Sequence, residues 1–246
     1  MIWSRKSKPD PKPRELERKV QDWGNRMAQS MEQPPEQTLQ QSKDVLKWSR
    51  RKNGPDSPTT IKAMNEVANQ LSQQGRVTEE IAYREQIAEL LHKNMGPEDE
   101  STLNAEFKLA TCLMALERPE EAEPLLAHVV AGRCVALGED DPQTLAALAW
   151  SASVARKLGR LGHARTLQEQ VVNGYESRGE AESTQGLLAA LNLASTLIEL
   201  DELPEARPLL RSVLAIRRDT LGADDPKTLD VERVLASIEA SPDAAP

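Results

Sequence analysis

Histidine and cysteine side chains are the residues here that could bind a metal or act as nucleophiles. The three histidines, His92, His128 and His163, stand apart, with no Cys, Asp or second His at a metal-ligand spacing. Cys112 and Cys134 fall in stretches of helical pattern and are too few for a disulfide framework. No phosphate-binding glycine loop or nucleophile elbow occurs. The sequence therefore predicts no enzyme, no metal site and no cofactor.

One octapeptide returns along the chain at a fixed interval. It reads GEDDPQTL from Gly138, and related copies begin at residues 54, 96, 180 and 222, so that successive starts are 42 residues apart. The copy at Glu180 lacks both the glycine and the proline. Self-similarity at one period of this size is the signature of a repeat array. Because a glycine ends one helix and an Asp-Pro or Ser-Pro pair starts the next, each copy predicts a junction between helices.

Each repeat is expected to hold two helices, here called helix A and helix B. The pattern predicts A helices over Thr60–Gln73, Thr102–Leu116, Thr144–Leu158 and Thr184–Leu200. It predicts that the B helices end at Met95, Leu137, Gly179 and Leu221. One A-helix position is alanine in every repeat, which predicts close packing there: Ala68, Ala110, Ala152, Ala194 and Ala236. The last stretch, from Pro226 to about Ala240, supplies helix A alone, as a capping helix does at the end of an array.

These residues resemble tetratricopeptide repeats of the 42-residue, kinesin-light-chain-like kind. The matching segments include LGEDDPQTL, LGADDPKTL, LNLA at 191–194 and PEEAEPLL at 119–126. The resemblance covers residues 54–246. It implies an all-α fold, a right-handed superhelical solenoid of tetratricopeptide-like helix pairs with a C-terminal capping helix and extra N-terminal helices. It also implies a protein-binding scaffold, and it implies nothing about kinesin itself.

In the resembling family the A helices line a concave groove. Counting from the alanine positions gives the expected partner-binding residues, which are Asn65, Asn69, Phe107, Lys108, Trp150, Ser153, Arg156, Asn192 and Ser195. Asn65 and Asn192 match family asparagines that bond the backbone of an extended peptide, as an amide can both donate and accept. Phe107 and Trp150, one repeat apart, are expected either to form a pocket for an apolar anchor or to fill space between A helices. Lys108 and Arg156 would attract an acidic flank of the ligand.

Residues 1–53 differ from the repeats and are expected to form a basic N-terminal arm with one or two helices. Apolar residues from Leu16 to Met31 follow a helical stripe, and a second helix is expected from Glu36 to about Arg51. Three of the four tryptophans lie in this arm: Trp3, Trp23 and Trp48. The arm is expected to cap the first repeat, to dock on a partner or, through its basic lead, to touch a membrane.

Charge divides the chain in the same place. Residues 1–53 carry 13 Lys and Arg against 7 Asp and Glu, whereas residues 54–246 carry 18 against 32. An acidic array is a poor surface for phosphates, so nucleic acid is not an expected partner. No apolar run is long enough to cross a bilayer, and the few cysteines favour a cytoplasmic location. The sequence thus predicts a non-catalytic adaptor or scaffold that binds a peptide or a partner helix in its concave groove. An assembly subunit docked through the arm is the alternative, and a homo-oligomer stays open.

Overall fold

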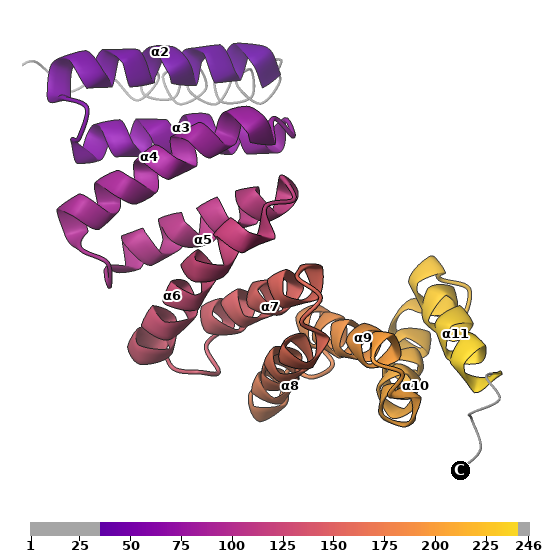
Figure 1. Cartoon of the computed structure of the whole chain (residues 1–246). Helices are drawn as coiled ribbons and strands as arrows, with labels where there is room; N and C mark the ends of the chain where they lie inside the picture. The colour runs from indigo at the N-terminus through magenta and orange to yellow at the C-terminus, as the bar shows by residue number, and fades with distance from the viewer. Residues whose placement is uncertain (1–34, 241–246) are drawn as a thin grey trace, which may run out of the picture. The chain divides into compact units, whose positions relative to one another are not determined.

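The computed structural model describes residues 35–240, which form helices joined by short turns. The chain divides into two compact units, Met1–Gly75 and Arg76–Pro246. In the first unit α2 (Pro35–Asn53) lies against α3 (Pro58–Gln73), as Figure 1 shows. The second unit holds α4 (Val77–Met95), α5 (Glu100–Ala115), α6 (Pro119–Leu137), α7 (Pro142–Lys157), α8 (Leu161–Ser177), α9 (Thr184–Glu199), α10 (Leu203–Leu221) and α11 (Pro226–Glu239).

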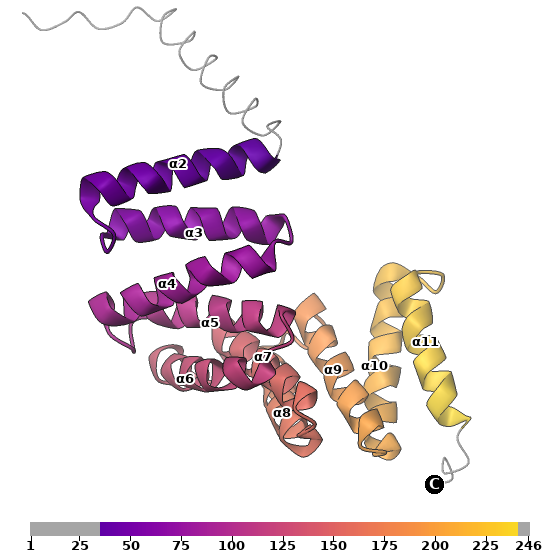
Figure 2. The ribbon, with the colours of Figure 1, turned by 45° about the horizontal axis from the view of Figure 1, so that its top comes forward.

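Within the second unit every helix packs on the next one along the chain (Figures 1 and 2). The A helices are α5, α7, α9 and α11, and the B helices are α4, α6, α8 and α10. Each of α6, α8 and α10 therefore packs between two A helices. The expected all-α repeat fold is confirmed, with α11 as the final helix A.

The returning octapeptide ends one helix and starts the next, as predicted. Gly96, Gly138 and Gly222 follow B helices with φ of +91°, +96° and +94°, a region that side-chain-bearing residues rarely adopt. Three residues further on, an aspartate caps the A helix. The Asp141 carboxylate, for example, accepts a hydrogen bond from the Gln143 backbone N–H at 2.8 Å. The same sequence therefore produces the same junction in successive repeats.

The copy at Glu180, which lacks the glycine and the proline, produces a different junction. α8 ends at Ser177, two residues before the Gly179 end that the pattern predicts, so the predicted end is wrong. Gly179 instead follows the helix with φ of +68°, and the Glu180 N–H closes the turn on the Tyr175 carbonyl at 2.8 Å. This is the closing bond of a helix-terminating turn built on a left-handed glycine. Gly179 thus has the left-handed conformation that the octapeptide glycine has in the other repeats, but it stands one residue earlier.

The alanine position packs tightly in four repeats and fails in the fifth. Ala68, Ala110, Ala152 and Ala194 are at most 1% exposed, but Ala236 on α11 is exposed. Its expected burial is wrong because no further described helix lies beyond α11 to cover it. A terminal repeat has a partner on one side alone.

α2 begins and ends 42 residues before α4, 84 before α6 and 168 before α10, so it is in register with the B helices. It buries Leu39 and Leu46 against the first unit's core but leaves Val45 and Trp48 each 56% exposed. The Lys52 ammonium lies 4.7 Å from the centre of the Trp48 ring. Trp3, Trp23 and the predicted helix from Leu16 to Met31 lie outside the described residues. The division of the chain at residue 53 stays a prediction.

Candidate interaction face of the A helices

An apolar pocket of about 280 Å³ lies among α7, α8 and α9. Trp150 and Ser153 line it from α7, and Leu188 and Asn192 from α9. Tyr175 on α8 also contributes to the wall. Leu188 is 49% exposed and Trp150 is 37% exposed, so both present apolar surface to solvent beside the pocket. We call it the α7–α9 pocket. It brings together three of the predicted residues: Trp150, Ser153 and Asn192.

A second pocket, of about 300 Å³, lies among α9, α10 and α11 and is the same site one repeat later. Six lining residues follow six residues of the α7–α9 pocket by 42 positions; they are Leu191, Ser195, Arg217, Asp230, Val231 and Val234. The predicted residue Ser195 lies here. We call it the α9–α11 pocket. Three charged side chains line it, Glu199, Arg217 and Asp230, whereas no charged side chain lines the α7–α9 pocket.

The corresponding position one repeat earlier is occupied by the Arg133 side chain. Its guanidinium lies 4.7 Å from the centre of the Phe107 ring and donates to the Gln143 carbonyl at 2.8 Å and to Asn104 Oδ1 at 2.9 Å. Phe107 therefore stacks under Arg133 and lines neither pocket with Trp150. Neither of these two pockets brings the two aromatic rings together. The choice between the two alternatives for Phe107 stays a prediction.

The polar side chains at the α7–α9 pocket differ in whether they form hydrogen bonds within the protein. Ser153 Oγ donates to the Ala149 carbonyl at 3.0 Å within its own helix. Within residues 35–240, no hydrogen bond is made by the side-chain amide of half-buried Asn192 or by that of exposed Gln185, which lies on the same wall. An amide carries two donors and one acceptor oxygen. The pocket wall thus offers a hydrogen-bonding group beside an apolar surface.

Sequence reasoning missed Tyr175, Gln185 and Leu188 as lining residues. Leu188 and Gln185 lie on the same face of α9 as Asn192, one turn and two turns earlier respectively. Tyr175 shares its position in helix B with Arg133 and Arg217. The appearance of long side chains at that one B-helix position in three repeats is the signal that could have identified it.

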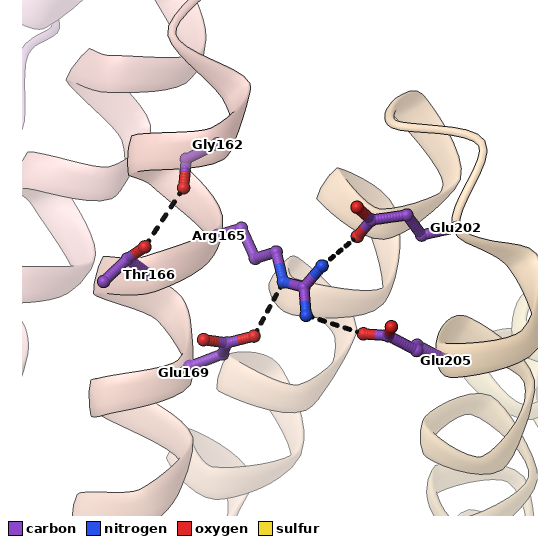
Figure 3. Close-up of polar contacts among 6 residues, drawn as sticks. All are labelled: Gly162, Arg165, Thr166, Glu169, Glu202 and Glu205. Atoms are coloured by element: carbon purple, nitrogen blue, oxygen red, sulfur yellow. Dashed lines mark hydrogen bonds and ion pairs between the residues drawn. The ribbon is translucent and has the colours of Figure 1, made fainter.

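Ion pairs connect the neighbouring repeats that form the pockets. Arg165 on α8 bonds Glu169 on its own helix at 2.8 Å, and Glu202 and Glu205 of the following repeat at 2.5 and 2.8 Å (Figure 3). The predicted ligand-binding residue Arg156 pairs with Glu199 at 2.5 Å, which joins α7 to α9. The charge of Arg156 is therefore already neutralised by the next repeat. Each such exposed ion pair adds little to the free energy of unfolding, but together the pairs fix the positions of neighbouring helices.

The remaining predicted residues lie elsewhere. Asn65 and Asn69 are half-buried on α3, in the first unit, so their relation to the pockets stays a prediction. Lys108 is exposed on α5 and lines neither pocket. Partial burial, and next the nearby Arg84 guanidinium, lower the pKa of the Lys108 ammonium.

A polar cluster that the sequence did not suggest surrounds Glu106. This carboxylate is buried on α5, at a position that holds Leu148 in the next repeat. His128 Nδ1 lies 2.5 Å from one Glu106 oxygen, His92 Nδ1 lies 3.9 Å from the other, and Glu98 lies 3.7 Å from His128 Nε2. The hydrogen bond to Glu106 raises the pKa of His128. The two histidines, widely separated in sequence, are brought to one carboxylate by the packing of α4, α5 and α6.

The described residues show no activated nucleophile. Burial raises the pKa of the Cys112 thiol to about 12, and burial also raises the pKa of Cys134, so both favour the unreactive protonated form. Over residues 35–240 no group of three His, Cys, Asp or Glu side chains is arranged to hold a metal ion. None of the helices in that range is long and apolar enough to cross a membrane.

Comparison with protein families agrees with the repeat pattern. A family model described as tetratricopeptide repeat matches residues 99–177, and another with the same description matches residues 187–227. A search of curated proteins found no match.

Solved structures share the fold over most of the chain. One holds the nearly identical TPR-like repeats of a Podosopora anserina protein described as a kinesin light chain, with 26% identity and a TM-score of 0.69 over 84% of this chain and 93% of the other. BtubC (BKLC) from P. vanneervenii has 12% identity and a TM-score of 0.68 over 86% and 85%. A Rap protein complexed with competence and sporulation factor has 14% identity and a TM-score of 0.53 over 75% and 55%.

The family models, the 42-residue period and the packed helix pairs agree with one another. Residues 99–177 and 187–227 are therefore tetratricopeptide repeats, and the fold of the chain is similar to that of kinesin-light-chain-like repeat proteins.

Proposed function

We propose that the protein is a non-catalytic scaffold that binds an extended segment of a partner protein across the two pockets of α7, α9 and α11. Tetratricopeptide repeats generally mediate contacts between proteins, and this proposal assigns that role to a particular surface. The observation that carries it is the α7–α9 pocket, where exposed Trp150 and Leu188 lie beside the unbonded Asn192 amide. Interaction sites combine an apolar anchor pocket with a few polar groups in this way.

An extended segment fits this wall better than a helix does. A helix satisfies its own backbone groups, whereas an extended chain presents open N–H and C=O groups to the amides of Gln185 and Asn192. The α9–α11 pocket repeats the site 42 residues later, so one segment would place apolar side chains in both. Arg156, paired with Glu199, would position the α7 and α9 walls. A cytoplasmic location stays part of this proposal.

Selection from a random-sequence peptide display library on the full chain tests the proposal. We expect enriched peptides whose affinity is lost in Leu188→Glu and kept in Val135→Glu. Val135 is the matched control because it is 89% exposed on α6 and lines neither pocket. Peptides that bind both variants equally, or no enrichment at all, would refute it.

A second candidate function is an assembly subunit that docks through its N-terminal arm. The exposed Trp48 ring under the Lys52 ammonium favours it, because a large exposed aromatic side chain is a common anchor at protein interfaces. Deleting residues 1–34 and substituting Trp48→Ala would then abolish capture of the native partner, whereas Leu188→Glu would not.

A further inference from the structure

The two open pockets have a counterpart one repeat earlier, between α5 and α7, which holds the protein's own Arg133 side chain. Subtracting 42 from the lining residues of the α7–α9 pocket gives its members. Three of them are bulkier or more polar than their counterparts: Asn104 for Ala146, Phe107 for Ala149 and Arg133 for Tyr175. Asn104 and Phe107 are half-buried, and Arg133 is only 4% exposed. We call this position the α5–α7 site.

Two arginines that share one B-helix position show what keeps Arg133 in the α5–α7 site. Arg133 Nη1 donates to the Gln143 carbonyl at 2.8 Å. Arg217, 84 residues later, makes the same bond, since its Nη1 donates to the Lys227 carbonyl at 2.7 Å. Arg217 is nevertheless half-buried, and it lines a pocket of about 300 Å³ that stays open. The arginine and its backbone bond are therefore not enough to close a site.

The other two contacts of Arg133 have no counterpart two repeats later. Arg133 Nη2 donates to Asn104 Oδ1 at 2.9 Å, but the later repeat has Leu188 at this position, and a leucine side chain cannot accept a hydrogen bond. The guanidinium also lies 4.7 Å from the centre of the Phe107 ring, close enough for attraction to the aromatic face, whereas the later repeat has Leu191. Because burial of a guanidinium is costly unless its N–H groups are bonded, Asn104 and Phe107 explain why Arg133 is the more buried arginine.

We propose that Asn104 and Phe107 lock Arg133 in the α5–α7 site, and that this lock ends the partner-binding surface at the α7–α9 pocket. The inference rests on the function proposed above. An extended segment places apolar side chains in two consecutive pockets, and its continuation from α7 toward α5 meets a filled site. Phe107 thus fills space and forms no pocket with Trp150. The locked arginine determines specificity, because it limits the number of apolar anchors that the face accepts.

A double variant that copies the later repeat tests the lock. Asn104→Leu with Phe107→Leu gives Arg133 the two neighbours that Arg217 has, and circular dichroism checks that the variant is folded. In its crystal structure we expect the Arg133 side chain to leave the α5–α7 site and a pocket to open there. Phe107→Leu alone is the second variant, for use if the double variant does not fold. Arg133 in its present position, with the site still filled, would overturn the inference whatever the variant binds.

Peptide binding tests the consequence for the partner. The peptide selected on the wild-type chain is placed in a second display library, with random residues added at both ends. On the double variant we expect an apolar residue at one fixed end to tighten binding at least about tenfold, because burial of a leucine-sized side chain is worth this much. On the wild type and on Ser101→Leu we expect a gain below about threefold. Ser101 is the matched control because it is exposed on α5 and lines neither open pocket.

The outcomes separate this inference from the proposed function. An equal gain on the wild type and the double variant, or no gain on the double variant, would overturn the lock and leave binding at the α7–α9 pocket intact. A parent peptide whose affinity survives Leu188→Glu would instead overturn the proposed function. The crystal structure of the double variant would then decide by itself whether Asn104 and Phe107 hold Arg133 in place.

Discussion

Replacing Trp150 by alanine tests how much of the binding energy the α7–α9 pocket supplies. A tryptophan side chain can bury up to about 250 Å², and Trp150 is 37% exposed, so a ligand can cover about 90 Å² of it. At about 25 cal/mol per Å² this area is worth about 2 kcal/mol. We therefore expect Trp150→Ala to weaken the selected peptide about 30-fold.

Isothermal titration calorimetry with the selected peptide measures this loss. Trp48→Ala is the matched control, since Trp48 is more exposed but lies on α2, and its substitution should leave the affinity unchanged. Circular dichroism confirms that both variants are folded at the temperature of the titration. A change of less than about threefold for Trp150→Ala, or an equal loss for Trp48→Ala, would refute the assignment of the site.

Four further substitutions test the packing. Thr102 Oγ1 donates to the Gly96 carbonyl at 2.8 Å, whereas Thr144 Oγ1, at the same position one repeat later, is buried without a partner. Thr102→Val should therefore lower Tm by about 2–4 °C, and Thr144→Val should raise Tm or leave it unchanged. Equal shifts of Tm in thermal melts of the two variants would be inconsistent with these contacts. His128→Gln should cost most stability near pH 5 and progressively less as the pH rises above the unfolded pKa of about 6.5. The raised pKa of folded His128 gives a stabilisation that is complete below the unfolded pKa and lost as the pH rises through the folded pKa. A constant Tm difference would argue against the Glu106 pair. Arg165→Ala should speed hydrogen exchange at the start of α10, less so at high salt, and an effect that salt leaves unchanged would argue against the ion pairs with Glu202 and Glu205.

The fold could be predicted from the sequence because the same junction recurs. Gly138, Asp141 and Pro142 each have a local role in ending or starting a helix, and their repetition fixes helix lengths to within a few residues. The prediction failed at Gly179 because one shifted glycine moves the helix end. It failed at Ala236 because burial depends on a following helix, which no local pattern reports.

The site was harder to predict because it depends on what the B helices insert between neighbouring A helices. Trp150, Ser153 and Asn192 follow from counting along the A helices, and the structure brings them together. Phe107 obeyed the same count, but Arg133 from α6 covers its ring. Arg156 meets Glu199 from the next repeat, a contact between residues 43 apart that spacing within one helix cannot show.

A crystal structure of the full chain with the selected peptide tests the proposed site most directly. We expect the peptide in an extended conformation, with one apolar side chain between Trp150 and Leu188 and its backbone bonded to Asn192. A peptide bound to α2 or to the segment before it, with the α7–α9 pocket open, would contradict the proposal and favour docking through the N-terminal arm.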